Sequence, residues 1–155
     1  MIIIREATIQ DIPIMIELQQ KLAWETEQIR LDMQILTMGV NRVFEDASRG
    51  KYVVAVNKQE NETGVIVGCL MITNEWSDWR NGMTWWLQSV YVDAAHRKQG
   101  VFKKMYDHLL LTISKNPNII GLRLYVDKSN TRAQKVYQSL GMNGDHYTVF
   151  EWMKK

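Results

Sequence analysis

Apolar and polar positions along this 155-residue chain follow two different periods. Six short segments are apolar, alternate with period two, or are rich in aromatic and β-branched residues, which is typical of strands. They are residues 2–6, 51–56, 65–73, 84–92, 119–126 and 146–153. Because a polar turn joins 51–56 to 65–73, these two segments predict a β-hairpin.

Four other segments place apolar residues at intervals of three and four, which predicts helices. They follow Thr8, span 32–48 and 101–114, and follow Asn130. Thr8 and Asp11 have the spacing of a capping box, and Asn130 is a favourable N-cap. Since the helix at 101–114 lies between two predicted strands, the crossover favours parallel pairing of those strands.

Length and composition narrow the class of protein. A chain of 155 residues with 46% hydrophobic content can bury one core, so we expect a single domain over residues 1–155. The net charge is only +2 and no block of like charges occurs, which argues against a nucleic-acid partner. No apolar run approaches the length of a membrane span, and the N-terminal run is too short for a signal peptide.

The chain has one cysteine, Cys69, inside the apolar run 65–72. A buried and inert thiol is the expected state there, and this cysteine usage suits a reducing cytoplasm. The three histidines lack the spacing of metal ligands, so no metal is expected. The sequence also lacks a P-loop and a dinucleotide-binding glycine motif, which argues against nucleotide hydrolysis and hydride transfer.

The segment H-R-K-Q-G-V-F-K-K-M, residues 96–105, carries the clearest chemical signal. It turns the strand that ends at Val92 into the helix that begins at Val101, and it contains Gly100 at the turn. The amides that open a helix have no partners within it, and the helix dipole adds positive charge, so such a turn can hold a diphosphate. Taken alone, basic residues at such a turn are more often solvated surface charge, because exposure is the usual state of charged residues.

Two linked motifs resemble those of the GNAT superfamily of N-acetyltransferases. In Arg97-Lys98-Gln99-Gly100-Val101-Phe102, the arginine and the glycine match two anchors of the family motif, whereas Phe102 stands where the family has a small residue. About thirty residues later, a second set matches the helix after the family's fifth strand. This set is Asn130, Ala133, Tyr137, Leu140 and Gly141.

The resemblance covers nearly the whole chain and implies a mixed α/β fold of the α+β type. Its centre would be a mostly antiparallel sheet of six or seven strands, with strands 4 and 5 parallel and splayed apart, flanked by about four helices. The implied activity is acetyl-CoA-dependent transfer of an acetyl group to a primary amine, either on a small molecule or on a lysine-like group of a peptide. Homodimers are common in the family, so a homodimer is a further expectation.

The resemblance also assigns residues to acetyl-CoA. The diphosphate would lie on the main chain of the turn, which comprises Arg97, Lys98, Gln99, Gly100, Val101, Phe102 and Lys103. The backbones of Val90 and Val92 would pair with the pantetheine arm as if it were another strand. Asn130 would contact the cofactor while it caps its helix.

Tyr137 is the implied general acid, because a phenol keeps its proton at neutral pH and can protonate a departing thiolate. From spacing alone, Tyr137 could instead be a core residue. For the general base, Glu75 is the candidate and Asp78 another, but either could be a solvated loop carboxylate. A site that lowers the pKa of the amine could also work without a base.

Aromatic residues gather before the predicted cofactor site, and we expect some of them to bind the acceptor. Trp76 and Trp85, beside Asp78, would bind a cationic amine through cation-π contacts and charge, together with Trp24 and Glu25 from the first helical connection. Core packing is the alternative for the tryptophans. A non-catalytic acyl-CoA-binding sensor or accessory module is the alternative for the whole protein.

Overall fold

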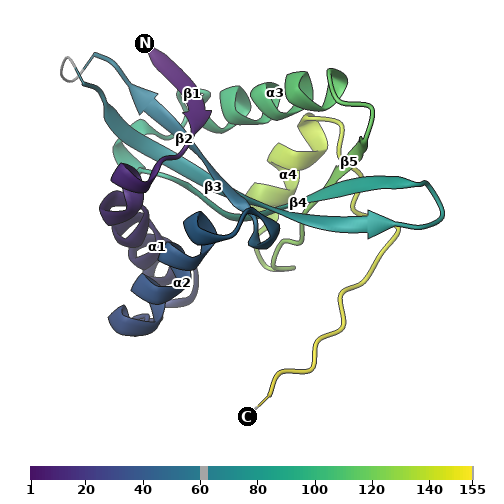
Figure 1. Cartoon of the computed structure of the whole chain (residues 1–155), viewed down its shortest axis with the longest axis horizontal. Coiled ribbons are helices and arrows are strands. Elements are labelled where there is room, and N and C mark those ends of the chain that lie inside the picture. Colours follow the sequence, from purple (N-terminus) through teal and green to yellow (C-terminus); the bar gives the residue numbers. More distant parts are fainter. Residues whose placement is uncertain (60–62, 155) are drawn as a thin grey trace. The chain divides into compact units, whose positions relative to one another are not determined.

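Five strands form one sheet in the computed structural model of the chain, which describes residues 1–59 and 63–154 (Figure 1). The strands are β1 (Ile2–Glu6), β2 (Lys51–Asn57), β3 (Val65–Ser77), β4 (Gly82–Val92) and β5 (Ile119–Arg123). They lie in chain order, and neighbours are antiparallel except for β4 and β5, which are parallel. The mixed sheet and the parallel β4–β5 pair confirm the predicted fold class.

The chain divides into two compact units, Met1–Arg123 and Leu124–Lys155. The first contains the sheet and the helices α1 (Ile12–Glu27), α2 (Met33–Glu45) and α3 (Val101–Ser114). The second contains α4 (Thr131–Ser139). The single domain expected from the length stays a prediction. No helix in the described part of the chain is long and apolar enough to cross a membrane.

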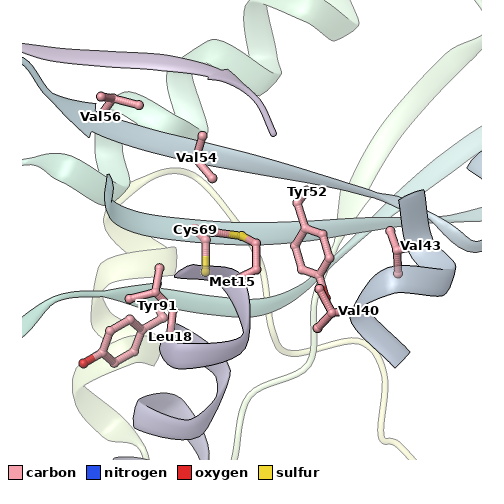
Figure 2. Packing of buried hydrophobic residues seen from close by; sticks show 9 residues of the cluster. All are labelled: Met15, Leu18, Val40, Val43, Tyr52, Val54, Val56, Cys69 and Tyr91. Atoms are coloured by element: carbon pink, nitrogen blue, oxygen red, sulfur yellow. The ribbon is translucent and has the colours of Figure 1, made fainter. Parts of the chain in front are cut away.

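Helices cover both faces of the sheet in the first unit. Met15 and Leu18 of α1 and Val40 of α2 pack with the buried ring of Tyr52 and the thiol of Cys69 in one core cluster (Figure 2). Successive residues of a strand point to opposite faces, and next to Cys69, Gly68 leaves room for α3. A methyl group at Gly68 would lie 3.4 Å from Val101 and 3.0 Å from the carbonyl oxygen of Tyr91, so α3 packs closely on the second face.

Local sequence signals explain several element boundaries. The Thr8–Asp11 capping box is present, and the Asp11 carboxylate also accepts hydrogen bonds of 2.7 and 3.0 Å from Arg5. The helix predicted at 101–114 has those bounds, because Val101, Met105 and Leu109 all lie buried along one stripe. The predicted crossover of strand, helix and parallel strand is also confirmed.

The predicted number of strands was too high. Residues 146–153 form no strand, and the side chains of Phe150 and Trp152 are 93% and 87% exposed. An alternating sequence becomes a strand only when another strand supplies hydrogen-bond partners, and none in the described chain pairs with this segment. The strand expected at 119–126 likewise ends earlier, at Arg123.

The hairpin of β3 and β4 is longer than the sequence indicated. Pairing continues from Thr73 opposite Trp86 to Ser77 opposite Gly82, so Glu75 lies in a strand and not in a loop. The turn that follows uses Asn81 with φ of 49°, a conformation that asparagine tolerates better than most residues.

Candidate active site

A tight turn at residues 97–100 precedes α3, after a short 3₁₀ helix at Ala94–His96. Lys98 and Gly100 both have left-handed backbones, with φ of 63° and 74°. A methyl group built on Gly100 would meet no atom within 4 Å, so the turn opens to solvent at this residue. The first helical hydrogen bond runs from the amide of Lys104 to the oxygen of Gly100, at 3.0 Å. A turn with left-handed residues that leads into a helix start exposes main-chain amides, which suits it to bind an anion.

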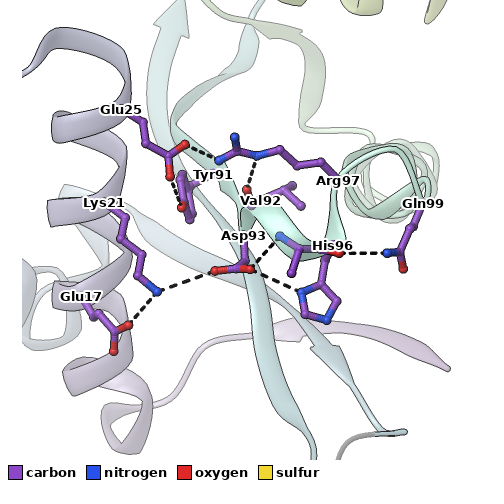
Figure 3. A network of polar contacts seen from close by, with 10 residues as sticks. Glu17, Lys21, Glu25, Tyr91, Val92, Asp93, His96, Arg97 and Gln99 are labelled. Carbon is purple, nitrogen blue, oxygen red and sulfur yellow. Dashed lines mark hydrogen bonds and ion pairs between the residues drawn. The ribbon is translucent and has the colours of Figure 1, made fainter.

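Two side chains of this turn fold back onto the protein (Figure 3). Arg97 donates from Nε to the carbonyl oxygen of Val92 at 2.8 Å, and its guanidinium forms an ion pair with Glu25. Gln99 donates to the oxygen of Ala95 at 3.1 Å. The side chains of Arg97 and Gln99 therefore stabilise the turn, and an anion would meet its main chain.

Glu25 connects α1 to this region. One carboxylate oxygen accepts a 2.7 Å hydrogen bond from the Tyr91 hydroxyl, and the other is paired with Arg97. Burial alone would raise the pKa of Glu25, but the bonds from Arg97 and Tyr91 outweigh burial and lower it. Burial and the bond to Glu25 raise the pKa of Tyr91. Both oxygens of Glu25 are thus engaged within the protein.

A second group of charges connects the end of β4 to α1, and no sequence motif indicated it. Asp93 forms a 3.6 Å ion pair with Lys21 and lies 3.5 Å from Nδ1 of His96. Burial would raise the pKa of Asp93, but its hydrogen bond from the amide of Ala95, its contact with His96 and the charge of Lys21 lower it. Figure 3 shows this group beside the Glu25 contacts.

On its second edge β4 has no strand partner beyond Trp86 among the described residues, because β5 pairs with β4 only from Met83 to Trp86. The amide of Asp93 donates to Val67 of β3 at 2.9 Å, so alternation turns the main-chain groups of Val90 and Val92 toward the other edge. The oxygen of Val92 is taken by Arg97. The amide and the carbonyl oxygen of Val90 are therefore the groups of this edge that could pair with an extended ligand.

A β-bulge interrupts β4 just before Val90. The register changes from Cys69 opposite Tyr91 to Met71 opposite Gln88, so β4 has one extra residue there. Ser89 in this bulge has φ of 50°, which is uncommon for serine. The Cys69 thiol donates to the oxygen of Ser89 at 3.8 Å. Bulges of this kind bend a strand and are frequent beside active sites.

A pocket of about 390 Å³ adjoins the bulge. It lies among α1, the segment that leads into α2, α2 itself, β2 and β4. Its lining residues are Gln19, Leu31, Asp32, Ile35, Leu36, Gly39, Val40, Tyr52 and Ser89. None of them was predicted as a site residue, although the polar Gln19 on the apolar face of α1 was a signal in the sequence.

The structure does not bring the predicted acceptor residues into this pocket. Trp85 is 6% exposed, borders a different pocket and lies under Lys51, whose Nζ is 5.1 Å from the ring centre. Trp24 on α1 lies beside Arg30, at 5.5 Å. Trp76 is more than half exposed near the end of β3, and Asp78 in the next turn accepts a hydrogen bond from the amide of Trp79.

Glu75, the candidate base, lies on β3 opposite Thr84. Its carboxylate accepts a 2.5 Å hydrogen bond from Arg123 at the end of β5. Glu75 is four residues along β3 from Met71, the pairing partner of Tyr52, which corresponds to about 13 Å at the rise of a strand. Glu75 thus joins β3 to β5 at some distance from the pocket.

In the second unit, Asn130 caps α4 as predicted, by accepting a 3.1 Å hydrogen bond from the amide of Ala133. Tyr137 lies in the same helix and is half-buried. Burial raises the pKa of Tyr137 above its ordinary value, so the phenol stays protonated at neutral pH. Tyr137 therefore meets the chemical requirement for a proton donor.

Comparisons with known proteins agree with this architecture. The sequence model of the family described as "Acetyltransferase (GNAT) family" matches residues 17–142. A possible acetyltransferase from Clostridium difficile 630 is 40% identical, with a TM-score of 0.89 over 99% of this chain and 98% of that one. A search of curated proteins gave no match.

Two more distant structures resemble the chain in fold. AAC(6')-Iy, in complex with a bisubstrate analogue, CoA-S-monomethyl-acetylneamine, is 16% identical, with a TM-score of 0.76 over 100% of this chain and 99% of that one. Glucosamine-6-phosphate N-acetyltransferase from Arabidopsis thaliana is 19% identical, with a TM-score of 0.72 over 99% of both chains.

Proposed function

Because the chain belongs to the GNAT family of acetyltransferases, we propose that it is an acetyl-CoA-dependent N-acetyltransferase that acetylates a primary amine directly. The observation that supports this best is the open turn at Gly100, where no neighbouring atom occupies the space above the backbone. A cradle of this kind fits a diphosphate. Bound acetyl-CoA would supply the acetyl thioester.

The cofactor contacts that we propose are mainly main-chain contacts. The amides from Lys98 to Lys103 would hold the diphosphate, and the edge of β4 at Val90 would hold the pantetheine arm. The side chain of Val101 is buried, and the ring of Phe102 packs on Tyr106 with 6.2 Å between centroids. Both residues would therefore act through their main-chain amides. Because the side chain makes no contact with the diphosphate in this arrangement, a phenylalanine can stand at residue 102, where the family has a small residue.

Tyr137 is the proton donor in this proposal, holding its proton on Oη for the departing thiolate. Asn130 would contact the cofactor from the same unit. The main-chain amide of Val90, beside the β4 bulge, would polarise the carbonyl that the amine attacks. Its orientation away from β3 supports this role, because the pairing of β3 with β4 does not use it.

An acyl-CoA-binding sensor or accessory module is the second candidate. The observation that favours it is the hydrogen bond from Arg123 to Glu75, because a carboxylate engaged in this way is a poor candidate for a base. A Glu75→Gln variant tests the role directly. A pH-rate profile like that of the wild type would remove Glu75 as the base, whereas loss of the acidic limb would support it.

A thiol-release assay with a panel of amines separates enzyme from module. We expect amine-dependent release of coenzyme A by the wild type and release at least about 100-fold slower by Tyr137→Phe. The affinity of the variant for coenzyme A, measured by calorimetry, should be unchanged and serves as the control for folding. Binding of acetyl-CoA without amine-dependent release by the wild type would favour the module.

Two coarser properties are also proposals. The free and buried thiol of Cys69 suits a reducing compartment, so we propose a cytoplasmic location. The exposed aromatic side chains of the C-terminal tail suit burial against a second copy of the chain, so we propose a homodimer.

A further inference from the structure

The pocket beside the β4 bulge has an apolar wall. Leu31, Ile35, Leu36, Gly39 and Val40 contribute this wall from α2 and the segment before it. Gly39 lies inside helix α2, and a methyl group built on it would meet no atom within 4 Å. The hollow is therefore not filled by the surrounding side chains. Such a wall can receive carbon-rich groups and offers hydroxyl groups no hydrogen-bond partners.

The polar groups of the pocket lie on the other elements, and they suit an amine. Gln19 is buried and donates from Nε2 to the sulfur of Cys69 at 3.7 Å, which leaves its carbonyl oxygen as an acceptor. Tyr52 is also buried, with its ring stacked on Phe44 and directed from β2 toward Val40 (Figure 2). The Tyr52 hydroxyl makes no hydrogen bond to the described chain, so it can accept one from an N–H group.

The charge of the lining excludes one class of ligand. No lysine, arginine or histidine of the described chain lines the pocket, so a phosphate or carboxylate group would lack a counter-ion there. The one charged lining residue is Asp32, whose Oδ1 accepts the 2.9 Å capping hydrogen bond from Ile35. The pocket thus accepts cationic or neutral polar ends and disfavours anionic ones.

Apolar side chains continue from the pocket onto the surface. Ile35 is 67% exposed, and Ile29, Met33 and Met38 nearby in sequence are each about half exposed. Exposed apolar side chains beside a pocket are typical of a binding site for an apolar partner. The surface around the pocket therefore matches its wall in character.

We propose that the acceptor is a primary amine on an apolar skeleton, such as an alkylamine or an arylalkylamine. The nitrogen lies toward Gln19, Tyr52 and the bulge at Ser89, and the carbon skeleton lies against the wall of α2. This inference rests on the proposed N-acetyltransferase function and specifies its substrate class. It disfavours amino sugars, because their hydroxyl groups would be buried against Leu36 and Val40 without hydrogen-bond partners.

Binding of amines to the protein saturated with coenzyme A tests the inference without relying on turnover. Calorimetry should show affinity rising about fourfold with each methylene from propylamine to hexylamine, as expected for burial of CH₂ groups. Phenethylamine should bind like hexylamine, and glucosamine should bind at least tenfold more weakly than either. Equal or tighter binding of glucosamine would overturn the inference.

The Gly39→Leu variant places a side chain in the empty part of the pocket. It should lower the affinity for hexylamine at least tenfold and leave the affinity for coenzyme A unchanged. The variant should still fold, because replacing a glycine inside a helix stabilises α2. Gln34→Leu is the matched control, because it adds the same side chain to α2 at an exposed residue outside the lining. Equal binding by Gly39→Leu and the wild type would contradict the assignment of the pocket.

Thiol release separates this inference from the function on which it rests. Release with glucosamine but not with hexylamine would overturn the substrate class and leave the acetyltransferase intact. If none of the amines causes thiol release but the protein still binds hexylamine in the pocket that Gly39 lines, the enzymatic function would be overturned and the ligand class of the pocket supported.

Discussion

Nε of Arg97 donates a 2.8 Å hydrogen bond to the carbonyl oxygen of Val92. The same guanidinium is paired with Glu25 of α1 and lies over the ring of Tyr91, at 5.4 Å. One side chain therefore connects the turn at residues 97–100 to the end of β4 and to α1. This makes Arg97 a positioning residue in our proposal, even though the family motif places it in the cofactor site.

A double-mutant cycle on Arg97 and Glu25 measures this connection. Since both side chains are about one-third exposed, solvent screens the pair, and we expect Arg97→Gln and Glu25→Gln to couple by about 1 kcal/mol in urea unfolding. The more exposed pair of Lys103 and Asp107 on α3 is the control, with a coupling of about 0.3–0.5 kcal/mol expected. Equal coupling in the two cycles would mean that the Arg97 contacts add nothing beyond a surface ion pair.

Gly100→Ala tests whether the open turn binds the diphosphate. The change should cost about 1 kcal/mol in stability, because alanine is strained at φ of 74°. Its methyl group would also stand in the space proposed for the ligand, so we expect the affinity for coenzyme A to fall. Gly141→Ala is a control matched in strain, with φ of 86° and equally open surroundings. If both variants bind coenzyme A alike, the cradle assignment is wrong.

The sequence predicted those elements whose signals are local. Val101, Met105 and Leu109 recur every four residues, and this spacing alone predicts the helix α3. The Thr8–Asp11 capping box likewise predicts a helix start without information from the rest of the chain. The tail at 146–153 alternates equally well but forms no strand, because alternation cannot specify a partner. Glu75 was placed beyond its strand because the length of a hairpin depends on the pairing of both strands.

The two parts of the candidate site differ in the same way. The turn at Gly100 was visible in the sequence, since a glycine between a strand and a helix indicates local chemistry. The pocket was not, because Gln19, Tyr52 and Ser89 come from three elements and meet only through packing. The bulge at Ser89 has no mark in the sequence, because serine rarely adopts a positive φ. The one signal in the sequence was Gln19, a polar residue on the apolar face of α1, because a polar residue at a buried position often belongs to a binding site.

Cys69 provides a test of pH dependence. Burial raises the pKa of its thiol to about 12 from an ordinary value of 9.0, and the hydrogen bond from Gln19 opposes the rise. A group whose pKa is higher in the folded state contributes stability that is present below its unfolded pKa and lost as the pH rises toward its folded pKa. The contribution of Cys69 should therefore fall between pH 9 and 12, by up to about 1.4 kcal/mol per pH unit.

Urea unfolding of wild type and Cys69→Ala at pH 8.0 and pH 10.5 measures this contribution. Between these two values we expect the wild type to lose about 2 kcal/mol more than the variant. Tyr52, whose pKa is raised to about 12 by burial and then by the charge of Cys69, is present in both proteins, so the part of its contribution that comes from burial cancels in the comparison. Equal losses would show that the thiol is not shielded from water, as would rapid reaction of native Cys69 with a disulfide reagent.

The exposed aromatic residues of the C-terminal tail lead us to expect a dimer. Phe150 and Trp152 have almost their whole surface in water, which is costly for large aromatic side chains and typical of an interface without its partner. β5 is an edge strand of the sheet, and edge strands readily accept another strand. We therefore expect tails to bind to a second copy of the chain, giving a particle of about 36 kDa from two 18.2 kDa chains in light scattering.

The double variant Phe150→Glu, Trp152→Glu should return the protein to the mass of one chain, because two charges in place of two aromatic rings would have to be desolvated at the interface. Trp79→Glu is the matched control: Trp79 is 91% exposed in the β3–β4 turn, so its replacement changes the surface similarly and should leave the dimer intact. Coenzyme A binding by the double variant would show that its fold is intact. A wild type that scatters as a single chain would overturn the dimer, and a double variant that still scatters as two chains would place the interface elsewhere.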